Sequence, residues 1–322
     1  MNVIEVTGFG DRDVLETADR DTPEPDPSEV RIAVEAVGVN FADIMQRRGH
    51  YPGGPQPPYV PGMEAAGTID AVGEGVDREV GERVVAMTNE AYAEYTTANV
   101  DALFAIPEQM SSEEAAGFPV QFLTAHNTLF EWGGLTEGES VLIHAAAGGV
   151  GTAATQLASQ AGAETFGTAS TREKLDLAEE LGLDHGIQYT ETDFADAVND
   201  ATDDEGVDLV LDGVGGDTTQ RSLSCLTDFG RMTVYGAASG EPGHPDTSTL
   251  LFNNHTVIGY HLGQAIERVP QRVLGAVPDL TEALVSGDLD VVVGETFPLA
   301  DAAEAHAYIE NRESSGKVVL VP

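Results

Sequence analysis

Two hydrophobic patterns divide the chain. In residues 1–110 apolar and polar positions alternate over short runs, as where Val30, Ile32 and Val34 are separated by Arg31 and Ala33. Strict alternation is typical of half-buried strands. Many short strands between proline- and glycine-rich turns favour a compact, β-barrel-like domain. Further strands are predicted at residues 67–76 and 82–86, and a loop rich in proline and glycine at residues 51–58.

A helix start is predicted at residues 111–114, with serine at the cap and two acids in the first turn, and from about residue 120 onward apolar strands alternate with amphipathic helices. The strands are predicted at residues 141–144, 164–167, 207–211 and 231–235, and the helices at residues 152–160, 171–181 and 218–226. Such alternation predicts a parallel sheet with helices on both faces. The last segment of the chain resembles the first domain in its pattern. Helices are predicted there at residues 268–286 and 301–311, and strands at residues 291–297 and 317–321. We therefore predict one domain from residues 1–119 and 263–322, with an α/β domain of residues 120–262 inserted.

Charge then restricts the partners. The 322 residues carry 15 basic and 55 acidic side chains, a formal charge of −40. This balance argues against binding to nucleic acid or to an anionic membrane surface, and no stretch of 18 apolar residues predicts a membrane span. Met1 to Asp11 does not have the pattern of a signal peptide. With Cys225 the only cysteine, a reducing, cytoplasmic setting is expected.

The basic residues are unusual, because only Lys174 and Lys317 are lysines and the other thirteen are arginines. A large acidic excess with little lysine is typical of proteins that work in concentrated salt, where the repulsion within a −40 surface is screened. We therefore expect a halophilic protein. An ordinary acidic bacterial enzyme is the alternative.

The most informative local motif lies where the first strand of the α/β block ends. The strand at residues 141–144 runs into small residues, and Ala146, Gly148 and Gly151 match a variant of the dinucleotide fingerprint. In that pattern one glycine admits a pyrophosphate close to the backbone, and another lets helix and strand pack closely. The alternative is a turn whose glycines serve packing alone. The strand–turn–helix context favours the dinucleotide site.

The next strand indicates which dinucleotide binds. An NAD site usually has an acidic residue at this strand's end, for the ribose 2′-hydroxyl. Here residues 164–167 are followed by hydroxyl side chains and then by Arg172 and Lys174. Cations in the first turn of a helix oppose the helix dipole, so a purely structural role for them is disfavoured. The pattern favours NADPH over NADH.

Together these blocks resemble a known family. The chain is similar to zinc-independent quinone oxidoreductases of the medium-chain dehydrogenase/reductase superfamily, the group that contains ζ-crystallin. The resemblance covers nearly all residues and is carried by Val39-Asn40-Phe41-Ala42-Asp43, Val60-Pro61-Gly62-Met63-Glu64-Ala65-Ala66-Gly67, Leu123-Thr124-Ala125, the Ala-Ala-Gly-Gly-Val-Gly turn, Asp212-Gly213-Val214-Gly215-Gly216-Asp217 and Gly316-Lys317-Val318-Val319. It implies a GroES-like catalytic domain and a Rossmann domain, with the cofactor in the cleft between them.

The resemblance also implies roles for individual residues. Asn40 and Tyr51 are expected to face the nicotinamide and the substrate, with Asn40 stabilising an oxyanion and Tyr51 doing the same or supplying a proton. The remaining cofactor contacts that it implies are Thr124 near the nicotinamide; Gly148, Gly149, Val150 and Gly151 at the pyrophosphate; Ser170, Lys174 and Tyr189 at the 2′-phosphate; and Tyr235, Gly236, Ser239 and Lys317 along the cofactor.

No metal site is expected. Zinc relatives have Cys in the slot of Asn40 and His in the slot of Met63, together with a four-cysteine lobe, and this chain has one cysteine in total. Glu64 is interpreted as a buried structural acid rather than a ligand, and His50 as a loop residue.

Without zinc to activate an alcohol, the chemistry that remains is hydride delivery to an electrophilic acceptor. The sequence leaves three activities open: a quinone reductase, a reductase of α,β-unsaturated aldehydes or ketones, and an NADPH-binding protein with little turnover. Family resemblance further implies a homodimer, for which residues 252–262 offer an edge strand.

Overall fold

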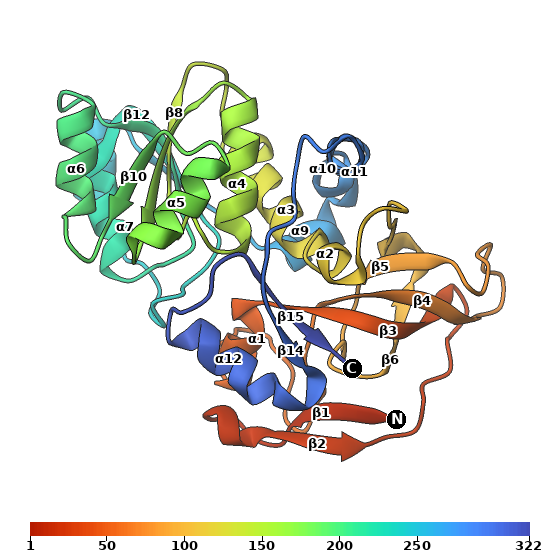
Figure 1. The fold of residues 1–322 in the computed structure, drawn as a ribbon. Helices are drawn as coiled ribbons and strands as arrows, with labels where there is room; N and C mark the ends of the chain where they lie inside the picture. Colours follow the sequence, from red (N-terminus) through yellow and green to blue (C-terminus); the bar gives the residue numbers. More distant parts are fainter. The chain divides into compact units, whose positions relative to one another are not determined.

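The computed structural model describes residues 1–322 and separates into two compact units, shown in Figure 1. Unit 1 comprises Met1–Val120 and Val291–Pro322, and unit 2 comprises Gln121–Asp290. The first division lies within two residues of the predicted one. The second falls at residue 290, whereas the sequence placed it at residue 262, because the helices between these positions pack on unit 2.

Unit 1 is built on a mainly antiparallel sheet of seven strands. Its order is β14-β15-β3-β4-β5-β7, with β6 also paired to β3. The long β3 is bulged opposite β4 near Val34 and Ala36, which lets one strand pair with several neighbours. The strands are β3 (Glu29–Val39), β4 (Glu64–Val72), β5 (Arg83–Met87), β6 (Tyr95–Asn99), β7 (Leu103–Ala105), β14 (Val293–Pro298) and β15 (Lys317–Val321), and β1 (Asn2–Val6) with β2 (Leu15–Asp19) forms a separate hairpin.

Three α-helices accompany this sheet: α1 (Phe41–Arg47), α2 (Ser112–Ala116) and α12 (Ala302–Glu310). The predicted helix start at Ser111 is confirmed, since the Ser111 hydroxyl accepts the N–H of Glu114 and the Glu114 carboxylate accepts the N–H of Ser111. The core of the unit joins residues from both ends of the chain, among them Val37, Tyr92 and Val318.

Unit 2 contains a six-stranded sheet whose neighbouring strands are all parallel, in the order β10-β9-β8-β11-β12-β13. This is the doubly wound arrangement that the alternating pattern predicts, and ligands of such sheets bind at the carboxyl ends of the strands. The strands are β8 (Ser140–Ile143), β9 (Glu164–Ala169), β10 (His185–Gln188), β11 (Val207–Asp212), β12 (Leu226–Val234) and β13 (Thr256–Gly259).

The helices of unit 2 differ from the predicted ones in number and in bounds. They are α3 (Pro119–His126, which starts in unit 1), α4 (Gly149–Gln160), α5 (Arg172–Glu180), α6 (Phe194–Ala201), α7 (Asp217–Ser222), α8 (Thr247–Asn253), α9 (Leu262–Arg268), α10 (Pro270–Leu274) and α11 (Val277–Ser286). The single helix predicted over residues 268–286 is wrong, because Pro270 removes a backbone donor and restricts Val269. The helix predicted over residues 218–226 ends at Ser222, and β12 already begins at Leu226.

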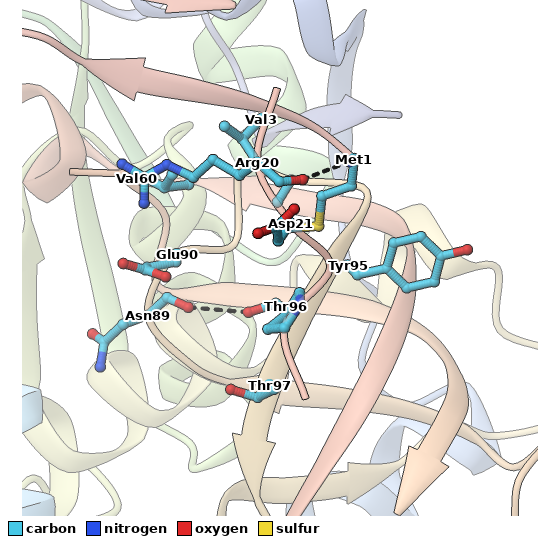
Figure 2. Close-up of a pocket in the computed structure, with 12 residues that line it drawn as sticks. Met1, Val3, Arg20, Asp21, Val60, Asn89, Glu90, Tyr95, Thr96 and Thr97 are labelled. Atoms are coloured by element: carbon cyan, nitrogen blue, oxygen red, sulfur yellow. Dashed lines mark hydrogen bonds between the residues drawn. The ribbon is translucent and has the colours of Figure 1, made fainter. Parts of the chain in front are cut away.

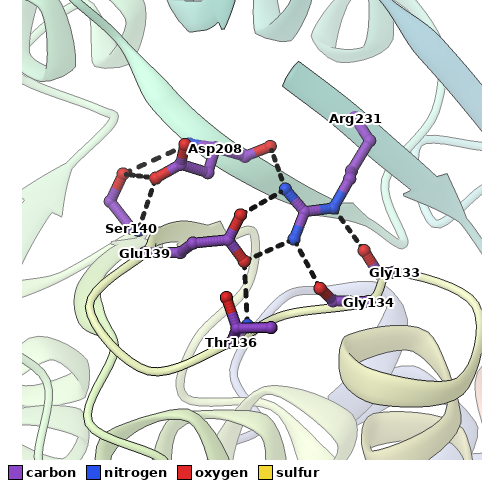
Figure 3. A network of polar contacts seen from close by, with 7 residues as sticks. All are labelled: Gly133, Gly134, Thr136, Glu139, Ser140, Asp208 and Arg231. Atoms are coloured by element: carbon purple, nitrogen blue, oxygen red, sulfur yellow. Dashed lines mark hydrogen bonds and ion pairs between the residues drawn. The ribbon is translucent and has the colours of Figure 1, made fainter. Parts of the chain in front are cut away.

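The end of the sheet opposite the binding edge is fixed by Arg231, as Figure 3 shows. Its guanidinium binds both Glu139 oxygens, at 2.9 and 2.6 Å, and also donates to the carbonyls of Gly133, Gly134 and Asp208. A planar donor group that satisfies one carboxylate and three carbonyls is suited to locking a loop against a strand. Arg231 therefore stabilises the fold of unit 2 and is not part of the candidate binding site.

Candidate functional site

The glycine-rich turn joins β8 to α4 at the carboxyl edge of the unit 2 sheet. Gly148 is the N-cap of α4, and no side chain caps the first amides of the helix. A Cβ on Gly148 would meet only the Ala145 carbonyl oxygen, at 3.3 Å, so one side of this residue is open. The predicted pyrophosphate residues Gly148, Gly149 and Val150 thus form the start of a twelve-residue helix. Open amides at such a helix start suit a phosphate.

The turn fits a dinucleotide in a second respect. A Cβ on Gly149 would lie 2.6 Å from the Gln121 Oε1 atom, so a side chain at this position would displace the end of the Gln121 side chain. Gln121 is 1% exposed, and neither atom of its amide has a hydrogen-bond partner. A pyrophosphate can approach the backbone closely where the residue has no side chain, as at Gly149, and where polar groups lie nearby. Gln121 was not predicted, because nothing in its local sequence marks it.

The residues predicted for the 2′-phosphate lie near the carboxyl ends of β9 and β10. β9 and β10 are parallel, with Ala169 opposite Gln188, so Ser170 and Tyr189 follow at the same edge. The Tyr189 N–H donates to the Ala169 carbonyl, at 3.1 Å, and 38% of Tyr189 is exposed. Lys174 lies in the first turn of α5, whose N-cap is Thr171. Arg172 in the same turn is already ion-paired with Asp176 and Glu179.

Two other predicted contacts of unit 2, Tyr235 and Ser239, also lie at this edge. Tyr235 directly follows β12, and its N–H donates to the Asp212 carbonyl, at 3.0 Å. Ser239 donates its N–H to the Val214 carbonyl, at 2.8 Å. Thr124 is a buried residue of α3. Direct contact of these residues with the cofactor stays a prediction.

Asp212, at the end of β11, organises this edge. The family resemblance marks it only as part of a motif and assigns it no role. Its carboxylate accepts the N–H groups of Val214 and Gly215 and the Thr219 hydroxyl. These bonds hold the turn after β11, in which Gly215 has a φ of +74°. A buried acid at the end of an apolar strand was the signal that could have identified it.

In unit 1, three predicted or discussed residues form one buried cluster. The Lys317 Nζ atom lies 2.5 Å from Glu64 Oε1 and 2.8 Å from Asn40 Oδ1. The Asn40 Nδ2 atom donates to Glu64 Oε1, at 2.9 Å, and to the Gly38 carbonyl, at 3.3 Å. Because ammonium groups only donate and carboxylates only accept, these contacts fix the orientation of the Asn40 amide. The interpretation of Glu64 as a buried structural acid is confirmed, since it is fully buried and also accepts the Val120 N–H.

Lys317 was expected along an anionic cofactor. It is 3% exposed and its charge is matched by Glu64, so the pair is neutral as a unit. Its contact with the cofactor stays a prediction.

A second buried network centres on Asp43. Its Oδ2 atom accepts the Asn40 N–H, at 2.8 Å, and the Tyr92 hydroxyl, at 3.2 Å. Arg47 donates to His306 Nδ1, at 3.2 Å, which leaves the ring proton on Nε2 to donate to the Tyr92 oxygen, at 3.0 Å. Arg47 also pairs with Glu310. The hydrogen bonds from Arg47 through His306 and Tyr92 therefore all donate in the direction of Asp43.

Burial dominates the ionisation of this network. It raises the pKa of Asp43 to about 7, although the Asn40 N–H and the Lys317 charge lower it. Burial likewise lowers the pKa of His306 to about 3. Burial and the Asp43 charge together raise the pKa of Tyr51. Asn40 and Tyr51, the two predicted catalytic residues, are therefore both coupled to Asp43.

Replacing Asp43 with asparagine is expected to change how stability varies with pH. Because the pKa of Asp43 is raised from 3.8 to about 7 on folding, the unfolded chain loses this proton first as pH rises. The wild type therefore loses stability relative to D43N between about pH 4 and 7, by up to roughly 4 kcal/mol. Above pH 7 the difference is constant. Urea unfolding at a series of pH values measures it, and a difference independent of pH would contradict the burial argument.

The structure also has a hollow of about 140 Å³ in unit 1, behind the N-terminal hairpin (Figure 2). It is lined by residues that include Met1, Arg20, Asp21, Glu90 and Thr97, and by none of the predicted site residues. Ligand pockets of drug size need about 300 Å³ or more. This hollow is therefore too small for a nicotinamide together with an acceptor.

Comparisons with known proteins agree with this architecture. Residues 26–118 match the family model described as "Alcohol dehydrogenase GroES-like domain", and residues 149–277 match "Zinc-binding dehydrogenase". No group of three or more His, Cys, Asp or Glu side chains is placed to hold a metal ion. No helix is long and apolar enough to cross a membrane.

Three curated relatives match most of their own length. The chain is 36% identical to the human "Synaptic vesicle membrane protein VAT-1 homolog", over 100% of this chain and 86% of the relative. It is 36% identical to a "2-haloacrylate reductase" from Burkholderia sp., over 92% of each. It is 34% identical to a "Quinone oxidoreductase" from Pseudomonas aeruginosa, over 99% of each.

Two solved structures that contain NADPH have the same fold. A mycobacterial protein complexed with NADPH superposes with a TM-score of 0.94 at 38% identity, and Escherichia coli quinone oxidoreductase complexed with NADPH with a TM-score of 0.93 at 32% identity. Each comparison covers 100% of both chains. With a glycine turn that fits the cofactor and non-ligating residues in both zinc slots, the chain belongs to the zinc-independent, quinone oxidoreductase-like group of the medium-chain dehydrogenase/reductase superfamily and is an NADPH-dependent oxidoreductase.

Proposed function

We propose that this protein is an NADPH:quinone reductase. The observation that carries the proposal is the Lys317–Glu64–Asn40 cluster, in which Asn40 occupies the position where the family resemblance puts the cysteine ligand of zinc relatives. Such a site has no Lewis acid to activate an alcohol, and it favours an acceptor that is electrophilic already. The full-length similarity to a quinone oxidoreductase supports the same acceptor class.

Bound NADPH supplies the hydride, and the chain supplies orientation and charge. The shorter Asn40 Nδ2 contact, to Glu64, holds the amide, while the 3.3 Å contact to the Gly38 carbonyl is weak. The N–H on that side is therefore the one that the protein engages least and that is available to a reduced acceptor oxygen. Lys317, bound to Asn40 Oδ1, polarises the amide and strengthens this donor. Tyr51, whose pKa is raised, stays a neutral donor at physiological pH.

An assay with three acceptors tests the proposal. NADPH oxidation is followed with a simple benzoquinone, with an α,β-unsaturated aldehyde and with 2-chloroacrylate. We expect the highest kcat/KM with the quinone. A preference for either conjugated C=C acceptor would replace the proposal with the second candidate, an enone or 2-haloacrylate reductase, which the similarity to a 2-haloacrylate reductase favours. Tight NADPH binding without turnover of any acceptor would indicate a binding protein.

Lys174→Ala is expected to weaken NADPH binding and leave NADH binding unchanged. Loss of a charged contact to the 2′-phosphate is worth about 10- to 100-fold in the dissociation constant. Arg172→Ala is the matched control in the same helix turn. Its guanidinium is already paired with Asp176 and Glu179, so its effect should be smaller. Fluorescence titration with both cofactors measures this, and an unchanged NADPH to NADH ratio in K174A would refute the 2′-phosphate assignment.

We also propose a homodimer formed through β13. This strand is at the edge of the sheet, and Leu251 and Phe252 beside it are 72% and 81% exposed. An unpaired edge next to large apolar side chains favours pairing with an identical edge. Phe252→Asp should lower the mass measured by light scattering from that of a dimer to that of a monomer.

A halophilic setting is proposed from the charge, and a cytoplasmic one from the single cysteine. Most arginines are bound to carboxylates, yet the 55 acidic residues exceed the 15 basic ones and leave a net charge of −40. Screening by molar salt relieves this repulsion. Thermal stability is expected to rise with KCl concentration, and equal stability in dilute buffer would remove the basis for the proposal.

A further inference from the structure

A buried polar chain crosses the carboxyl edge of the unit 2 sheet through His144. This residue follows β8 directly, is 2% exposed and immediately precedes the glycine turn. Its Nδ1 atom lies 3.1 Å from the Thr168 Oγ1 atom of β9, and its Nε2 atom lies 2.8 Å from the Ser222 Oγ atom of α7. One imidazole thus connects three elements that meet at the cofactor edge.

The direction of each hydrogen bond follows from the partners. The Ser222 hydroxyl donates to the Thr218 carbonyl, at 2.7 Å, so its oxygen accepts from His144 Nε2. His144 Nδ1 is then the unprotonated nitrogen and accepts from the Thr168 hydroxyl. Burial lowers the pKa of His144 to about 4, which keeps the ring in this neutral form near pH 7.

Thr168 is the link between His144 and the glycine turn. Its Oγ1 atom accepts the Ala145 N–H, at 3.3 Å, and its carbonyl accepts the Ala146 N–H, at 3.0 Å. Ala145 has a φ of +54°, a left-handed conformation that residues with a side chain rarely adopt. With its proton directed to His144, the Thr168 hydroxyl has its lone pairs available to accept the Ala145 N–H. The first amides of the turn are therefore held by Thr168, and Thr168 by His144.

Thr168 also leads to the other end of the predicted cofactor site. It is followed at the end of β9 by Ala169 and Ser170, and then by the Thr171 cap of α5. The Thr190 hydroxyl donates to the Ser170 carbonyl, at 2.9 Å. A shift of Thr168 would therefore move both the turn expected at the pyrophosphate and the corner expected at the 2′-phosphate.

We propose that His144 is a positioning residue for NADPH, which acts through Thr168 to hold the glycine turn and the end of β9 in the arrangement that binds the adenosine half of the cofactor. The role concerns binding of the dinucleotide and does not depend on which acceptor is reduced.

The test uses the whole protein and measures NADPH binding by fluorescence, without any acceptor. Thr168→Val removes the hydroxyl at nearly constant volume, and His144→Phe removes the imidazole. Each is expected to raise the NADPH dissociation constant by about tenfold, the value of one well-placed hydrogen bond. Ser222→Ala is the matched control, because it cuts the chain on the side away from the turn. We expect it to change the dissociation constant less than about threefold while lowering the melting temperature.

The double variant H144F/T168V separates positioning from general destabilisation. If the two residues act as one chain, the double variant binds NADPH no more weakly than the weaker single variant. Additive losses, or wild-type binding in T168V with a melting temperature lowered as in S222A, would overturn the proposal. Should H144F fail to fold, T168V and S222A still decide the question. Absence of quinone turnover would leave these binding constants unaffected, so failure of the proposed function is a distinct result.

Discussion

Lys317→Met is expected to lower the free energy of unfolding by about 3–5 kcal/mol, because it leaves the fully buried Glu64 carboxylate without its counter-charge. It also removes the donor that holds Asn40 Oδ1, so the amide loses its fixed orientation. Activity should therefore fall further than stability alone explains. Urea unfolding and steady-state kinetics at one salt concentration measure the two effects.

The matched control is the double variant K317M/E64Q. Glutamine carries no charge to bury, and its single amide oxygen can still accept one of the two donors that now reach Glu64, the Val120 N–H or the Asn40 amide. Replacing both members of a buried ion pair is often close to neutral, whereas removing one member is not. The double variant should therefore recover most of the stability that the single variant loses. Equal losses in both would show that Lys317 contributes through packing and not through charge.

This cluster also shows where prediction from sequence ends. Lys317 and Asn40 are 277 positions apart, and Lys317 and Glu64 are 253 apart. No periodicity or spacing connects residues at such separations, and the family resemblance marked each of them without indicating their mutual bonds. The sequence therefore points to the three residues of the cluster. It does not indicate that Glu64 neutralises the charge of Lys317.

Local features were predicted better. The glycine turn, the alternation of unit 2 and the Ser111 cap all depend on residues within one or two turns of each other. The helix predicted over residues 268–286 also fails for a local reason, because Pro270 interrupts it and begins a separate helix. His144 was missed for a different reason. A histidine after an apolar strand has no partner until β9 and α7 are folded beside it.

The second large effect is expected at Gly151. A Cβ at this position would lie 2.7 Å from the Cα and carbonyl carbon of Ala146 and closer still to the Ala145 carbonyl oxygen. These are backbone atoms of the turn itself, so relief requires α4 to move away from β8. Overpacking against backbone costs at the upper end of the usual range, and Gly151→Ala should lower the free energy of unfolding by at least about 3 kcal/mol. Thermal unfolding measures this loss.

Gly148→Ala separates folding from binding within the same turn. Its φ of −82° and ψ of 177° are open to alanine, and the new Cβ would meet only the Ala145 carbonyl oxygen, at 3.3 Å. We therefore expect G148A to fold with near wild-type stability. Its methyl group would occupy the space where the pyrophosphate approaches the backbone, so NADPH binding should weaken about tenfold or more. If instead G151A were stable and G148A bound NADPH normally, the glycines would serve neither packing nor close approach, and the dinucleotide interpretation of the turn would lose its physical basis.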